Sequence, residues 1–451
     1  MDEGIKKAPE SIGGKSDAVG VGVGESLRYA GAPGMILAYA LIVSAEGAVF
    51  NIIIGYWTDA IPTAAAMTLF LVIVYAIHFM PSTWFAETEF ITAAIKVVTI
   101  TVVLIVCLAL LGGAGPTGTT HHAENYLELP LFPHGFKGVC SVIPLAAWGM
   151  GGQEIMGISA GESHMPRWDM PRAFKSLLVR IVIFFMFSVI LIGILVRYDD
   201  PNLLNTSNAA SSPFVIAMQN AGIKVLPDIL NGVILIGLLG IGSESLYISS
   251  RVLYAMSEMK MMPGIIGRVD QKGRPRWALL VTMIISAGLT YLDVSSSSGT
   301  VLWWFSSIGS TVSFMIWMSM AATNWAVHRA IKAQNDPAFD LPYAWKIPLW
   351  PLSPAYLFFA TVIVFGLVIW TSSCPIGSTP SASNFFETCI GLPIGIVCYV
   401  GYKLWFRTKI VRPKEADLVT GRRLLTEENI AFLEAYYRQP TWKRILSYLS
   451  F

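Results

Sequence analysis

Long apolar stretches constrain the fold of this chain more than any other feature. A helix that crosses a bilayer needs about 20 apolar residues at a rise of about 1.5 Å each. Ten stretches meet or approach this length, at 33–57, 61–80, 90–113, 136–160, 175–197, 229–249, 277–293, 302–327, 350–372 and 385–405. In lipid each backbone must satisfy its own hydrogen bonds, which an α-helix does. We therefore predict an all-α polytopic membrane protein with ten spans.

The composition agrees with this class. Hydrophobic residues make up 54% of the 451 residues and charged residues only 13%, which is too apolar a balance for a soluble protein of this size. The net charge of +2 indicates no nucleic-acid partner. The first residues are polar and Gly-rich rather than a basic stub before an apolar core, so we expect the first span to act as the targeting signal.

The distribution of Lys and Arg predicts the orientation. Basic residues cluster after the fourth, sixth and eighth stretches, whereas loops 294–301 and 373–384 contain none. Short loops that are rich in Lys and Arg stay in the cytosol. The alternation places both termini in the cytosol, which is consistent with an even number of spans.

The stretch AAWGMGGQEIMG at 146–157 lies inside the fourth span. Glycine in a helix interior costs about 1 kcal/mol relative to alanine, so Gly149, Gly151 and Gly152 indicate either a helix interruption or close approach of another helix. Glu154 favours the interruption, because an ionisable group in a span implies a polar cavity, a partner or a transport path. Unwound backbone is tolerated at such a cavity. The stretch GVGVGES at 20–26 is a weak echo of this motif, as expected for inverted repeats.

Several longer motifs resemble a known family, the fungal amino-acid permeases of the amino acid–polyamine–organocation superfamily. The resemblance extends over nearly the whole chain from about residue 45. The motifs are GFKGVCSV at 135–142, SAGESHMPRWDMPRAFK at 159–175, LVRYDDPNLL at 195–204, SPFVIAMQNAGIKVLPDILNGVIL at 212–235, LYISSRVLYA at 246–255 and DLVTGRR at 417–423.

The resemblance implies a fold and an activity. The family has a LeuT-type fold of twelve helices, of which the first ten form two inverted repeats, and its members import amino acids at the plasma membrane, generally as symporters with H⁺ and by alternating access. It implies a permease transmembrane domain at 22–405 between cytosolic tails at 1–21 and 406–451. The partners expected are an amino acid, H⁺ and the lipid bilayer.

The resemblance also implies a substrate site. The unwound part of the family's sixth helix corresponds to Ala147–Gly152, whose backbone would hold the amino and carboxylate ends of the solute. The substrate-binding candidates are Gly22, Gly24, Ala147, Trp148, Gly149, Met150, Gly151, Gly152, Ser243 and Ser307. A flexible polar tail is the alternative for the first two glycines. Hydrogen bonds to their own helix carbonyls are the alternative for Ser307 and its neighbours Ser306, Ser310 and Thr311.

Four ionisable residues are candidates for coupling or gating: Glu46, Lys96, Glu154 and Glu244. Lys96 occupies the helix-five lysine position of the family, and a buried lysine shifts its pKa readily; snorkelling is the alternative. Glu46 matches the family's helix-three glutamate. Glu244 replaces a more usual neutral residue, and it either favours a cationic solute or faces a cytosolic opening.

The chain departs from the family in having ten spans rather than twelve. Part of the first three helices is missing by this comparison, with the joint near Val43 and Ser44. Such a loss would displace the partners of Glu46 and Lys96 and leave unpaired charges in the membrane. We accordingly expect low stability, retention in the endoplasmic reticulum and negligible uptake by this chain alone.

The sequence leaves several functions open and disfavours others. The competitors to amino-acid transport are a choline or polyamine carrier and a truncated, non-transporting permease form. The chain has no Walker A loop and no HExxH or CxxC metal pair. We therefore expect no enzyme activity, no metal and no cofactor.

Overall fold

The chain forms a bundle of helices in the computed structural model, and no strand occurs in the part that the model describes. The described residues are 25–451 except 154, 161–162, 164, 204–211, 259–260, 272, 293–297, 338–339, 341–346, 348, 378, 407–410, 420–424 and 447–451. The helices of the first half are α1 (Glu25–Ile54), α2 (Thr63–Phe79), α3 (Ser82–Leu111), α4 (Glu124–Glu128), α5 (Gly135–Gly149), α6 (Ile155–Ser159), α7 (Pro166–Arg180), the π-helix η1 (Ile181–Met186) and α8 (Phe187–Leu195).

The second half continues in the same way. Its helices are α9 (Pro213–Asn220), α10 (Leu226–Glu258), α11 (Arg276–Leu292), α12 (Ser298–Gln334), α13 (Leu352–Ser373), α14 (Ala382–Cys389), α15 (Gly391–Phe406), α16 (Glu427–Tyr437) and α17 (Thr441–Leu446). Proline stands at the start of several of them, as at Pro166 in α7 and Pro213 in α9. The fixed φ of proline suits the first turn of a helix, where its missing N–H costs nothing.

Each of the ten stretches predicted from the sequence falls on one or more of these helices. Six helical segments are long and apolar enough to cross a membrane by themselves, including α1, α3, α10 and the continuous run α7–η1–α8. Three predicted spans are shorter apolar helices, α2, α5 and α11, and the last is the pair α14 and α15, which is bent by 64°. The membrane-spanning, all-helical class is therefore confirmed, whereas the count of ten spans stays a prediction.

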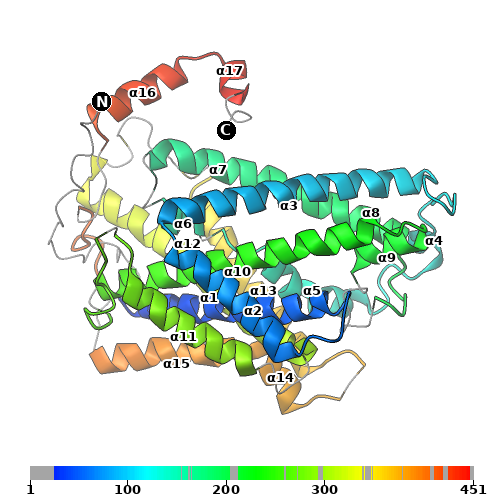
Figure 1. Ribbon diagram of the computed structural model, residues 1–451. Coiled ribbons are helices and arrows are strands. Elements are labelled where there is room, and N and C mark those ends of the chain that lie inside the picture. Colours follow the sequence, from blue (N-terminus) through cyan, green and yellow to red (C-terminus); the bar gives the residue numbers. More distant parts are fainter. Residues whose placement is uncertain are drawn as a thin grey trace.

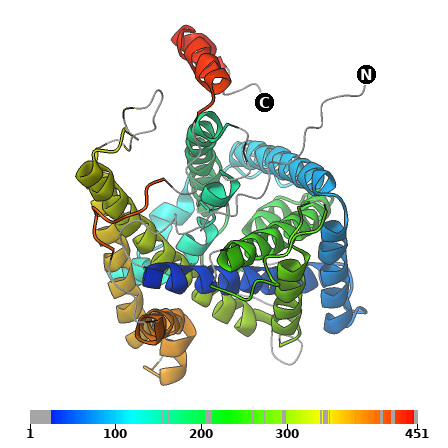
Figure 2. The same ribbon diagram turned by 90° about the vertical axis from the view of Figure 1, so that its left-hand side faces the viewer.

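The helices run side by side across the molecule, and the loops that join α10 to α11 and α12 to α13 lie at the same end (Figure 1). These are two of the loops that the Lys and Arg pattern predicts to be cytosolic. The helix α16 lies near that end, above α7 (Figures 1 and 2). Trp168 of α7 packs edge-on against Phe432 and Tyr436 of α16, with ring centroids 5.4 and 5.9 Å apart.

The centre of the bundle is α1. It is one continuous helix through the predicted joint, where Val43 and Ser44 are both fully buried. In the apolar stretch of this span 67% of the residues are buried, whereas only 6% are buried in the apolar stretch of the span α7–η1–α8. The chain thus surrounds α1 with α10, α11, α12 and α15, and exposes its most peripheral span to the bilayer.

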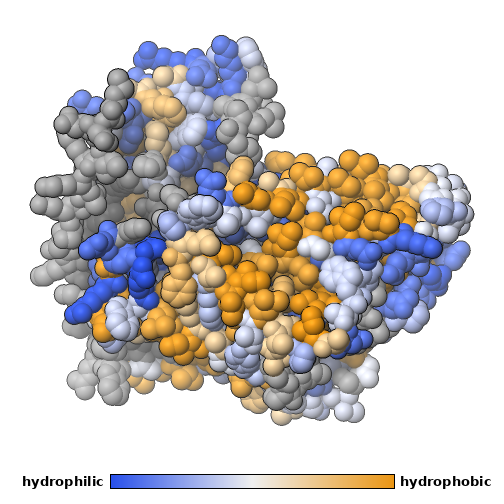
Figure 3. Space-filling model, viewed as in Figure 1, coloured by the Kyte–Doolittle hydropathy of each residue, from blue (hydrophilic) through white to orange (hydrophobic). Residues whose placement is uncertain are grey.

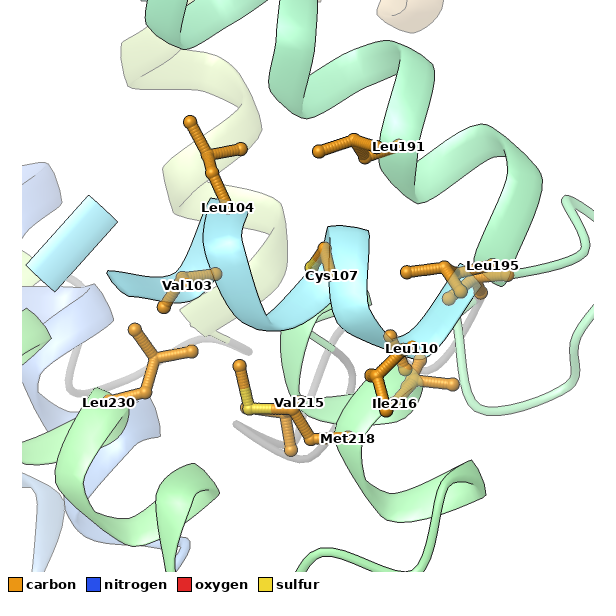
Figure 4. Packing of buried hydrophobic residues seen from close by; sticks show 12 residues of the cluster. Val103, Leu104, Cys107, Leu110, Leu191, Leu195, Val215, Ile216, Met218 and Leu230 are labelled. Atoms are coloured by element: carbon orange, nitrogen blue, oxygen red, sulfur yellow. The ribbon is translucent and has the colours of Figure 1, made fainter. Parts of the chain in front are cut away.

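The outer surface and the core fit a membrane environment. A broad hydrophobic surface extends over α3 and its neighbours, where Val98, Val102 and Ile105 are exposed (Figure 3). Beneath it, α3 packs against α8, α9 and α10. The buried side chains of that core are Val103, Leu104, Cys107 and Leu110 of α3 with Leu191, Leu195, Val215, Ile216, Met218 and Leu230 (Figure 4).

Candidate functional site

The helix of the fourth span is interrupted where the glycines predicted it. The helix α5 ends at Gly149 and the next helix, α6, begins only at Ile155. We call the non-helical residues Met150–Gln153 the helix break. Within it Gly152 has φ +100°, a conformation that residues with a Cβ rarely adopt. A Cβ on Gly149 would meet nothing within 4 Å, so close packing of a neighbouring helix does not explain this glycine. The interruption is confirmed and the packing alternative is wrong at Gly149.

Two contacts place the helix break within the bundle. On the α5 side the Ser310 hydroxyl of α12 donates to the Pro144 carbonyl at 2.9 Å. On the α6 side Ile155 packs against the core that Ile36 and Tyr39 of α1 form with Ile248 of α10. The break therefore lies between a serine-rich part of α12 and the central helix pair α1 and α10. Met150, in the break itself, is 43% exposed.

The serine and threonine side chains of α12 make the local bonds that the sequence left open. Ser310 also donates to the Ser306 carbonyl at 2.7 Å, and Thr311 donates to the Ser307 carbonyl at 2.8 Å. Each of these hydroxyls also reaches a second helix. Ser310 donates to the Pro144 carbonyl of α5, and Thr311 donates to the Thr388 carbonyl of α14 at 3.2 Å. These hydroxyls hold α12 to α5 and α14. Ser307 itself is 5% exposed.

Three of the four coupling candidates come together in the structure. The Lys96 ammonium on α3 interacts electrostatically with the carboxylates of Glu46 on α1 and Glu244 on α10, and also with Glu89, one residue that the sequence analysis missed. All four side chains are partly buried. We call Glu46, Glu89, Lys96 and Glu244 the charged seam. None of the ion pairs formed by the described residues includes Lys96, so the interaction acts over more than direct contact distance.

The expectation that Glu46 and Lys96 would lose their partners stays a prediction: their charges interact, but no ion pair among the described residues joins them. The helix α1 passes through the joint without interruption, and this continuity carries Glu46 to the side of the bundle where α3 and α10 meet. Opposite charges at this depth lower the cost that each would have alone.

Two glycines on α10 adjoin the lysine side chain. A Cβ on Gly237 would lie 3.5 Å from the Lys96 Cδ, and one on Gly240 would lie 3.6 Å from the Lys96 Nζ and 3.2 Å from the Thr92 Oγ1. Gly237, Gly240 and Glu244 are spaced by three and four residues and so share one face of α10. The stem of Lys96 thus lies along small residues with Glu244 on the same face.

Glu89 could have been found from its spacing. It stands seven residues before Lys96 on α3, which places both on one face of the helix.

His78 on α2 was missed too, and it is the residue that the Ser243 side chain contacts. The His78 Nε2 donates to the Ser243 carbonyl at 3.0 Å and lies 3.3 Å from the Ser243 Oγ. Ser243 is 2% exposed, and its hydroxyl contacts α2 rather than the helix break.

Aromatic side chains adjoin the charged seam on the predicted cytosolic side. The rings of Phe85 on α3 and Tyr247 on α10 are stacked with centroids 4.7 Å apart. The Arg251 guanidinium lies 5.0 Å from the centroid of the Tyr247 ring. Phe85 and Tyr247 follow Glu89 and Glu244 toward the cytosolic ends of their helices. A small cavity of about 50 Å³ lies beside them, lined also by His78 and Arg274.

Three of the predicted site residues cannot be placed. Gly22, Gly24 and Glu154 lie outside the described residues, and the same holds for the Trp148 side chain. The other candidates form two groups on different sides of α1 and α10: the helix break with Ala147 and Ser307, and the charged seam with Ser243.

The comparisons with known proteins agree with this arrangement. The family model for amino acid permeases matches residues 7–414. The chain belongs to the amino acid permease family. It is 32% identical to amino-acid permease GAP5 of Candida albicans over 427 residues, which cover 93% of this chain and 68% of that protein.

Two further relatives of this permease come from Saccharomyces cerevisiae. The general amino-acid permease GAP1 is 31% identical over 441 residues, or 94% of this chain and 73% of that protein. The histidine permease is 34% identical over 384 residues, or 83% and 63%. These matches support transport of an amino acid by an integral membrane protein.

Proposed function

We propose that this permease imports amino acids together with H⁺ by alternating access. The helix break within a member of this family carries the proposal, because broken helices form the solute sites of transporters built from repeats. The structure corrects the expected bounds, because Ala147–Gly149 still belong to α5 and the Met150 N–H donates to the Ala146 and Ala147 carbonyls. The backbone groups at the end of α5 and in the break itself would hold the carboxylate and amino ends of the solute. Trp148 and Met150 would shape the pocket for its side chain, with Ser307 on the facing helix.

The first repeat would complete this solute site. Gly22 and Gly24 are the proposed counterpart of the break. The sequence motif they share with residues 149–155 supports this pairing. In this scheme the transmembrane domain extends over 22–405 between the tails 1–21 and 406–451, and the LeuT-type arrangement of two repeats lets one group of helices rock against the other.

The charged seam is the proposed coupling element. The charge of Lys96 interacts with the carboxylates of Glu46, Glu89 and Glu244. Protonation of a carboxylate would weaken its attraction to Lys96, and in a low-dielectric site such a change is large enough to shift a conformational equilibrium. Glu154, which follows the helix break in sequence, would link the substrate site to this response.

A second candidate is a non-transporting permease form, and the continuity of α1 favours it. Two broken helices, one in each repeat, hold the solute in transporters of this kind. The proposed counterpart of the α5–α6 interruption, Gly22 and Gly24, lies outside the described residues, and α1 itself is helical without interruption from Glu25 to Ile54. Under this alternative the protein would remain in the endoplasmic reticulum, whereas the proposed importer acts at the plasma membrane.

Uptake in a permease-deficient cell separates the two candidates. The cells would express the full chain with a surface tag, and labelled neutral and cationic amino acids, choline and a polyamine would be offered in turn. The proposal predicts saturable amino-acid uptake that increases as the outside pH is lowered. If the protein reaches the cell surface but takes up no amino acid, the proposal is contradicted. If it takes up choline or the polyamine preferentially, the proposed substrate class is wrong.

A further inference from the structure

A groove between α12 and α13 stands apart from the helix break and the charged seam. It has a volume of about 460 Å³. Alanines form much of its floor, and aromatic rings form its wall. The lining residues used below are Ala322, Trp325, Ala326, Arg329, Ala355 and Phe358. Because α12 runs toward the predicted cytosolic side and α13 begins there, the groove lies in the cytosolic half of the bundle.

Sequence spacing explains why the groove is both hollow and charged at one end. Ala322, Ala326 and Arg329 follow one another at intervals of four and three residues, so they share one face of α12. On α13, Ala355 and Phe358 share the facing stripe. Small side chains on both helices leave the space open. Of the described residues that line the groove, Arg329 is the charged one.

Aromatic side chains fix the depth of this end of the groove. The Trp350 ring stacks on His328, with centroids 3.6 Å apart, and lies 5.8 Å from the Trp325 ring. Tryptophan concentrates at the boundary between the hydrocarbon core and the lipid headgroups. Arg329, next to His328 and one turn beyond Trp325, is therefore at headgroup depth, while Phe358 and the alanines lie toward the hydrocarbon.

The C-terminal segment adds positive charge at the same end. Val411 and Pro413 line the groove, and Gln334 at the end of α12 holds this segment by donating to the Pro413 and Ala416 carbonyls at 2.9 and 2.7 Å. In Figure 2 the segment crosses α12. Arg412 and Lys414 are exposed on either side of Pro413, and Lys332 is exposed one turn beyond Arg329.

Among the described residues, no ion pair neutralises these four cations. Arg329, Lys332, Arg412 and Lys414 take part in none of the ion pairs that the described residues form. A cluster of cations above an open apolar groove, at headgroup depth on the cytosolic side, matches an anionic headgroup with an acyl chain beneath it. Basic pockets between spans on this side bind anionic lipids in this way.

We propose that the groove between α12 and α13 binds one anionic phospholipid of the cytosolic leaflet, with the headgroup phosphate at Arg329 and an acyl chain along Ala322, Ala326, Ala355 and Phe358. The inner leaflet is the anionic one, so the charge of the lipid and the side of the groove agree. The lipid would join α12 to α13 and to the segment at 411–416. The site is independent of the solute and of the coupling residues.

The test uses the full chain in nanodiscs of phosphatidylcholine alone and with increasing fractions of phosphatidylserine. Native mass spectrometry would count the retained phosphatidylserine, and the unfolding temperature would be measured in parallel. We expect one retained phosphatidylserine and a rise in unfolding temperature. Arg329→Gln should weaken this binding by about fivefold, the effect of one cation at an anionic surface. Equal effects of phosphatidylcholine and phosphatidylserine on retention and unfolding would overturn the proposal.

Two further variants make the outcome specific to the groove. Arg438→Gln removes a cation of α16 whose side chain is 81% exposed, far from the lining residues, and should leave phosphatidylserine binding unchanged. Ala355→Leu keeps every charge but narrows the groove, and it should weaken binding as Arg329→Gln does. Unchanged binding in Ala355→Leu would show that no acyl chain occupies the groove. Stabilisation by soluble glycerophosphoserine equal to that by the lipid would overturn the proposal in the same way.

Discussion

The helix break and the charged seam both depend on glycine, for different physical reasons. At the break Gly152 adopts a φ of +100°, so the residue is needed for its backbone conformation. On α10 Gly240 is helical, and a Cβ there would lie 3.2 Å from the Thr92 Oγ1 beside Lys96, so the residue is favoured for space. The break offers backbone N–H and C=O groups, whereas the charged seam offers ionisable side chains. Solute binding and coupling are thus assigned to different kinds of chemical group.

The largest effect expected from this division is at Lys96. Replacing it with Met in Lys96→Met leaves three partly buried carboxylates without their cation, a change that costs several kcal/mol in a membrane site. We expect amino-acid uptake to fall at least about tenfold at matched surface expression. The control is Lys224→Met, which removes an exposed lysine before α10. Uptake by Lys96→Met equal to that control would remove the seam from the transport mechanism.

The second effect concerns the choice of solute and the response to pH. Glu244→Gln removes one of the three carboxylates that interact with Lys96. Charge discriminates strongly where the dielectric is low, so we expect uptake of cationic amino acids to fall several-fold relative to neutral ones. Competition between labelled lysine and leucine measures this ratio. An equal loss for both solutes would place Glu244 outside the solute path.

Glu89→Gln is the matched variant for that measurement. Glu89 also interacts with Lys96 but stands on α3 rather than α10. The Glu89→Gln variant should weaken the dependence of uptake on outside pH without changing the preference between cationic and neutral solutes. The same change in preference in both variants would mean that the seam acts as one charged surface rather than as two distinct carboxylates.

A third effect tests the break. Gly152→Ala forces a side chain into a positive-φ conformation, at a cost of about 1–2 kcal/mol. Solute affinity should decrease, because the peptide groups around the break would move. Gly157→Ala is the control, since Gly157 is helical in α6 and a Cβ there meets nothing within 4 Å. Measured KM values that are the same for both variants would show that the break does not position the solute.

The smallest effect is expected at Gly240. A Cβ in Gly240→Ala would come to 3.2 Å from the Thr92 Oγ1, so the threonine beside Lys96 must yield by a few tenths of an ångström. We expect about a twofold change in the pH dependence of uptake and none in KM. Gly232→Ala on the same helix meets no atom within 4 Å and serves as control. A KM change in Gly240→Ala would link the two regions that we separate.

The sequence was sufficient for those features that depend on local pattern. Hydropathy located the ten helical stretches, and the three glycines with Glu154 located the break, because each signal lies within one helix. The position of Val43 and Ser44 in one fused span followed from the motifs on either side, and α1 is continuous there.

The sequence was insufficient wherever two distant helices decide the outcome. Ser243 was assigned to the solute, but its partner is His78, 165 residues away. The interaction between Glu46 and Lys96 was not foreseen, because nothing in a linear sequence shows that α1 and α3 approach the same face of α10. Glu89 was passed over because a carboxylate near a helix end resembles a solvated residue until its neighbours are known.

The most direct test of the central claim is uptake by the purified protein in liposomes. The full chain would be reconstituted with a more acidic outside, and labelled amino acid would be added there. We predict saturable accumulation inside that collapses when a protonophore removes the pH difference, and that is lost in Lys96→Met but kept in Lys224→Met. Uptake no greater than in empty liposomes, from protein shown to be folded and inserted, would contradict the account and favour the non-transporting form.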